Sequence, residues 1–220
     1  MPAHRHNALR AAALATVLPL AASLCDAATA FAQNPRQVDD LAALLPAPNR
    51  KRACFARAYD ANHLTAHRAQ RVTAIVLALH YRHDPAPRDP DPFGFALSLK
   101  RRADRRALST AGNCRTLQPL DADFLAKLEP AQRAALEKER SALRGGPALE
   151  CYVECDGGGI IVERAGDAAA LLVHLDRIRM ANGCGEEENA IEVTGGSDDR
   201  VFRLDQAPPA MCRSLDRQLQ

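Results

Sequence analysis

Residues 93–100, Phe-Gly-Phe-Ala-Leu-Ser-Leu-Lys, carry the clearest structural pattern in the chain. The large apolar side chains of Phe93, Phe95, Leu97 and Leu99 alternate with smaller or charged ones. Because successive side chains of a β-strand point to opposite faces, this period of two predicts a strand with one face in a core. The other face is expected to meet solvent or small neighbours.

Neighbouring segments extend this strand into a β-rich fold. Residues 72–81 are apolar on both faces, which is typical of a central strand, and residues 107–116 are expected to return as another. Short strands between glycine turns predict an antiparallel sandwich or barrel. In the second half, these strands are expected at residues 151–155, 160–163, 169–176, 190–194 and 200–204.

Helices are expected in two places. Residues 36–45 have apolar side chains at helical spacing, and residues 51–59 are expected to add another turn or two. Residues 117–146 predict a helical connector between two β-rich parts, with Asp121 as a cap and Pro130 at the start of a second helix.

Residues 1–32 have the composition of a cleavable export signal. Arg5 and Arg10 provide a basic start, an apolar run follows at residues 11–24, and small residues suit cleavage near Ala32. This run is shorter than the roughly 20 residues that a spanning helix needs. The sequence therefore predicts a periplasmic or secreted protein without a membrane span.

The rest of the chain is long enough for one sizeable core. We predict a single β-rich domain over residues 33–220, in which the helical connector joins a first half, residues 33–116, to a second half, residues 147–220.

Six cysteines follow the signal, an even number that predicts three disulfides in an oxidising compartment. Four strand steps would separate Cys151 from Cys155 by roughly 13 Å, which is too far for a disulfide. If all six are bridged, no thiolate remains for catalysis or metal binding. The predicted pairs are Cys54–Cys114, Cys151–Cys212 and Cys155–Cys184.

Charge is distributed unevenly along the chain. Residues 33–150 contain 20 Lys+Arg against 13 Asp+Glu, whereas residues 151–220 contain 7 against 13. A compact cluster of cations, which we call the basic turn, follows the strand at residues 93–100. It is a candidate docking patch for an acidic protein or an anionic polymer of the cell envelope, or simply a solvated turn that guards a sheet edge. The basic turn comprises Lys100, Arg101, Arg102, Arg105 and Arg106.

Histidines suggest two further kinds of chemistry. His63, His67, His80 and His83 are close in sequence and could hold zinc or copper, although such histidines are more often ordinary polar residues at the ends of a helix and a strand. His174 is the nearest candidate for a base in a hydrolase whose site is assembled across strands, but a structural role is the more common one for such a residue.

No Gly-x-Ser-x-Gly string or pair of carboxylates typical of glycoside hydrolysis is evident. Export and the absence of tryptophan argue against a nucleic-acid partner. The leading hypothesis is a non-enzymatic, disulfide-stapled binding module without a cofactor. A zinc- or copper-binding protein and a hydrolase are the alternatives.

Overall fold

The computed structural model describes residues 52–81, 93–166, 170–181 and 190–219. All of them belong to one compact unit, Gln33–Gln220, while the other unit, Met1–Ala32, lies outside the described residues. The helix expected at residues 36–45 also lies outside them. None of the described helices has the length and apolar composition that a membrane crossing requires.

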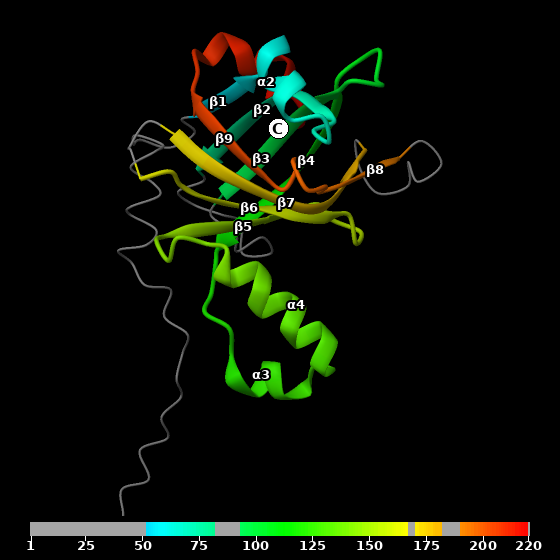
Figure 1. The fold of residues 1–220 in the computed structure, drawn as a ribbon. Coiled ribbons are helices and arrows are strands. Elements are labelled where there is room, and N and C mark those ends of the chain that lie inside the picture. Colours follow the sequence, from blue (N-terminus) through cyan, green and yellow to red (C-terminus); the bar gives the residue numbers. More distant parts are fainter. Residues whose placement is uncertain (1–51, 82–92, 167–169, 182–189, 220) are drawn as a thin grey trace, which may run out of the picture. The chain divides into compact units, whose positions relative to one another are not determined.

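Eight antiparallel strands form a closed barrel (Figure 1). Strands β1 to β7 pair in chain order, β7 also pairs with β9, and β9 pairs with β1 to close the ring. The predicted β-rich class is confirmed, and the architecture is a barrel rather than a sandwich. The barrel strands are β1 (Arg52–Ala58), β2 (Val72–Tyr81), β3 (Phe93–Arg101), β4 (Leu108–Thr116), β5 (Ala148–Tyr152), β6 (Gly158–Arg164), β7 (Ala170–Met180) and β9 (Val201–Gln206).

Side chains from alternate positions fill the barrel. Phe93, Phe95, Leu97 and Leu99 of β3 are all fully buried in this core, which confirms the predicted period of two. An eight-stranded barrel is just wide enough for such a filling. The short strand β8 (Ile191–Thr194) stands outside the ring and pairs with the second half of β7.

A second, smaller apolar layer lies on the outside of β1 to β3. The 3₁₀ helix η2 (Pro209–Gln218) packs Cys212 and Leu215 against Ala78 and Ala96, so the second face of β3 is also covered. A disulfide between Cys54 and Cys212 ties η2 to β1. The sequence did not predict this helix, because its proline-containing start resembles a loop.

Residues 51–59 were expected to be helical, and this prediction is wrong. Residues 52–58 form β1, which pairs with β2 over seven positions from Arg52 to Ala58. Ala53 and Phe55 face the barrel core, whereas Cys54 faces η2. Long-range pairing with β2 outweighs the weak helical preference of this alanine-rich segment.

The predicted disulfide pairs also need correction. Cys114 bonds to Cys151 and Cys54 bonds to Cys212, in place of the expected Cys54–Cys114 and Cys151–Cys212. The register of β4 and β5 sets Cys114 directly opposite Cys151, with 4.0 Å between their Cα atoms. Cys155 is disulfide-bonded as well, but Cys184, its expected partner, lies outside the described residues.

The predicted helical connector is present between β4 and β5 as α3 (Ala122–Lys127) and α4 (Pro130–Ser141). Asp121 caps α3 by accepting from the backbone N–H groups of Asp123 and Phe124, and Pro130 begins α4 as expected. Neither helix has a buried residue. We call residues 117–147 the lobe; the Cys114–Cys151 disulfide closes its base.

Candidate functional site

A tight hairpin forms one end of the candidate site. The triple glycine at residues 157–159 lies where β5 turns into β6. Cys155 and Asp156 have φ angles of 58° and 57°, and Gly157 N–H donates to the Glu154 carbonyl oxygen, as in a type I′ turn. A Cβ atom at Gly159 would lie 2.1 Å from the Cys151 carbonyl oxygen, so close strand approach requires glycine there.

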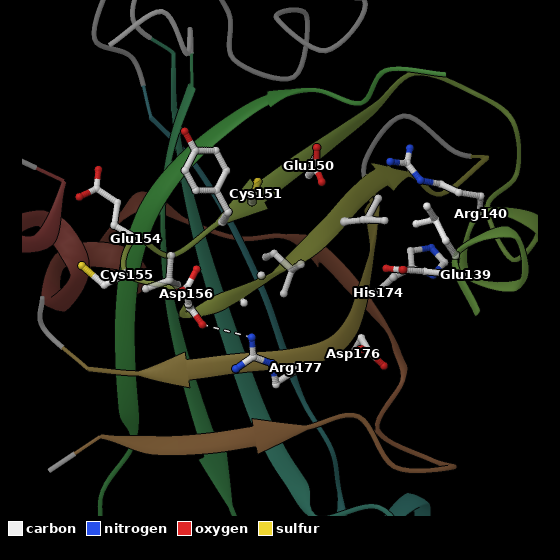
Figure 2. A pocket seen from close by; sticks show the side chains of 17 residues that line it. Glu139, Arg140, Glu150, Cys151, Glu154, Cys155, Asp156, His174, Asp176 and Arg177 are labelled. Carbon is white, nitrogen blue, oxygen red and sulfur yellow. Dashed lines mark hydrogen bonds between the residues drawn. The ribbon is translucent and has the colours of Figure 1, made fainter. Parts of the chain in front are cut away.

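A groove of about 690 Å³ runs along the outer face of β5 to β7 from this hairpin to α4. Figure 2 shows Glu139, Arg140 and His174 at one end, and Glu154, Cys155 and Asp156 at the other. A second cavity of about 770 Å³ separates α4 from β7 and the start of β9. The lobe therefore stands off the barrel and leaves space beneath α4.

Carboxylates dominate the charge of this groove, which we call the acidic groove. Arg140 and Arg177 are its only guanidinium groups among the lining residues, and both already have partners. Arg140 donates to the Gln118 carbonyl oxygen, while Arg177 donates to Glu192 and to the Asp156 carbonyl oxygen. The five lining carboxylates belong to Glu139, Glu150, Glu154, Asp156 and Asp176.

Glu139 of α4 is one of the carboxylates of this groove without a direct partner in the described part of the chain. Its carboxylate has no hydrogen bond or ion pair with any described residue, in contrast to Glu150, which pairs with Arg115 at 3.1 Å. Burial raises the pKa of Glu139, and the facing carboxylates of Asp176 and Glu150 raise it further, against the opposing effects of Arg140 and His174. A cation placed here would relieve this unfavourable charge.

A buried carboxylate fixes the position of His174. Glu163 of β6 is 1% exposed and its Oε1 accepts from His174 Nε2 at 2.8 Å. Its other oxygen accepts from the backbone N–H of Arg144 at 2.9 Å, which anchors the end of the lobe to the barrel. His174 was predicted from the sequence as a base and Glu163 was not, although a charged residue within the apolar run at residues 160–163 was a usable signal.

This pair has the hydrogen bonding of a general base, but the acidic groove supplies it with no conventional nucleophile. Among the described residues that line it there is no serine or threonine, and its two cysteines, Cys151 and Cys155, are disulfide-bonded; Ser141 lines the neighbouring cavity instead. What the arrangement does is position the lobe, because Glu163 contacts a barrel side chain and a lobe backbone group at once.

The basic turn lies elsewhere, at the connection between β3 and β4. Arg101 forms a bidentate ion pair with Asp104 at 2.6 and 2.8 Å, and Lys100 donates to the Arg105 carbonyl oxygen. Arg102 donates to the Leu64 carbonyl oxygen of α2 (Ala61–Ala66) at 2.7 Å. Only Arg105 and Arg106 are exposed and without a side-chain partner in the described part of the chain.

The histidines predicted as metal ligands are brought together only in part. The rings of His63 and His67 stack with centroids 4.4 Å apart, and His63 also bonds to Gln70. His80 lies near the other end of β2, opposite Arg52, and His83 lies outside the described residues. Within the described ranges no three His, Cys, Asp or Glu residues are grouped to hold a metal ion, and the zinc or copper site stays a prediction.

Comparisons with protein-family models, curated proteins and solved structures find no match for this chain.

Proposed function

We propose that this protein is an exported, non-enzymatic binding protein that holds a basic polypeptide segment in the acidic groove. The observation that carries the proposal is the lobe, whose two helices bury no residue and which forms one wall of a groove rich in carboxylates. Because its helices bury no residue, the lobe contributes little to the stability of the barrel, and a role in contacting a ligand explains its presence.

Charge gives the ligand its chemistry. Glu139 and Asp176 face each other across the groove from α4 and β7. Arg140 and Arg177 are engaged with other groups, while Arg200 lies 3.7 Å from Asp176. An arginine or lysine side chain that entered between Glu139 and Asp176 would gain charge-assisted hydrogen bonds and would lower the repulsion between the two carboxylates. The Cys114–Cys151 disulfide holds β5, which lines the groove, against β4, so this wall of the site is formed before the ligand arrives.

Titration of fluorescein-labelled hexaarginine, followed by fluorescence anisotropy, tests this function. We expect saturable binding that weakens as salt is added, and about fivefold weaker binding for the double variant Glu139→Gln/Asp176→Asn. The matched control is Glu137→Gln/Asp123→Asn, which makes the same charge change on the lobe outside the groove lining. Equal losses in the two variants would show that the peptide follows net charge, and the groove would be rejected as the site.

A further inference from the structure

Hydrogen bonds and an ion pair hold the basic turn in one conformation. The Arg101–Asp104 ion pair and the bond from Lys100 to the Arg105 carbonyl oxygen fix the turn internally. Arg102 fixes it externally, because its guanidinium donates to the last carbonyl groups of α2. A turn that is rigid before binding loses little conformational entropy when it docks.

These internal bonds leave two cations for a partner. Arg105 and Arg106 are exposed and adjacent, and neither side chain bonds to a described residue. The acidic groove presents the opposite charge, with Glu139 unpaired among the described residues and Asp176 paired only at 3.7 Å with Arg200. The two surfaces are therefore complementary in charge, with two unpaired cations on the turn and an excess of carboxylates in the groove.

The two surfaces cannot meet within one copy of the chain. The turn lies at the Leu108 end of β4, whereas the groove adjoins the other end, where Arg115 is opposite Glu150. Seven strand steps separate Leu108 from Arg115, which is roughly 23 Å. Arg102 also holds the turn against α2. Any contact between turn and groove must therefore join two molecules.

We propose that the basic turn of one copy docks in the acidic groove of a second copy. This inference rests on the proposed function, since it names the basic segment that the groove receives. The contact is head-to-tail: each copy offers its turn to one neighbour and its groove to another, so the assembly grows into a ring or an open chain. Charge dominates the contact, so added salt weakens it.

Sedimentation velocity of the full chain over a range of protein and salt concentrations tests the proposal. We expect species larger than a monomer at low salt and a return to monomer as salt rises. Neutralising the turn with Arg105→Gln/Arg106→Gln, or the groove with Glu139→Gln/Asp176→Asn, should leave each variant monomeric. A control, Arg213→Gln/Arg217→Gln, removes two exposed cations from η2 and should associate like the wild type.

Mixing the two variants gives the decisive measurement. The turn variant keeps an intact groove and the groove variant keeps an intact turn, so an equimolar mixture has one working contact and should stop at a 1:1 dimer. A wild-type chain that is monomeric at low salt, or a mixture that stays monomeric, overturns the proposal.

The same proteins separate this inference from the proposed function. If the turn variant and the wild type bind hexaarginine equally well but neither associates, the groove receives a foreign basic segment and self-docking is rejected alone. If hexaarginine binding is also insensitive to Glu139→Gln/Asp176→Asn, both proposals fall.

Discussion

The barrel and the lobe are built on opposite principles. Each barrel strand is hydrogen-bonded on both sides, and core residues such as Leu97 are completely buried. The lobe has two well-capped helices but no buried side chain, and Phe124 of α3 is 50% exposed. Local signals are enough to make the helices, whereas the barrel depends on long-range packing. The comparison indicates that stability resides in the barrel and leaves the lobe available for binding.

The largest effect should come from equal truncations in the two regions. Leu97→Ala removes a fully buried side chain and should lower the free energy of unfolding by about 2–5 kcal/mol. Leu136→Ala, on partly exposed α4, should cost less than about 1 kcal/mol. Urea denaturation followed by circular dichroism measures both. Similar losses of unfolding free energy in the two variants would contradict the conclusion that stability resides in the barrel.

A smaller effect is expected where the two regions are joined. Glu163→Ala leaves His174 and the Arg144 N–H without their shared acceptor, and should cost about 1–3 kcal/mol. Hydrogen exchange should show faster exchange of the Arg144 amide, while the amides of β3 stay protected.

The isosteric Glu163→Gln is the control, because its amide oxygen can still accept from Arg144. If Glu163→Ala leaves exchange at Arg144 unchanged, the carboxylate does not anchor the lobe. If Glu163→Ala speeds exchange of the β3 amides as much as that of the Arg144 amide, the lobe and the barrel unfold as one unit.

Most of the elements that depend on local patterns could be predicted from the sequence. The alternation at residues 93–100, the apolar run at residues 72–81, the cap at Asp121 and the helix start at Pro130 each carry their own signal, and the structure confirms all of them. These signals are short-range: a strand shows its period within a few residues, and a helix shows its caps at its ends.

What escaped prediction depends on residues far apart in the chain. Cys114 meets Cys151 only because β4 and β5, which the lobe separates in the chain, pair directly in the sheet. Cys54 meets Cys212 only because η2 packs over β1. The acidic groove likewise draws Glu139 and Asp176 from α4 and β7, which no local pattern associates. Closure of the barrel by β9 against β1 is a pairing of the same long-range kind.

The smallest expected effect concerns the pH dependence of the groove. Burial raises the pKa of Glu139, which faces Asp176 and His174 of β7 and Glu150 of β5, with Arg140 beside it on α4. As pH falls, Glu139 should take up a proton before a carboxyl of ordinary pKa, and hexaarginine binding should begin to weaken at this step. The folded chain binds this proton more tightly than the unfolded chain, so the contribution of Glu139 to stability should improve as pH falls through the same range.

Comparison of the wild type with Glu139→Gln isolates this step. The variant should lack this early decrease in hexaarginine binding, because it has no carboxylate at position 139 to take up a proton. Its urea-unfolding free energy should also vary less with pH over that range. Identical binding profiles for the two proteins would mean that Glu139 does not contact the ligand. The carboxylates of the barrel strands would then account for hexaarginine binding, and the lobe would have no part in it.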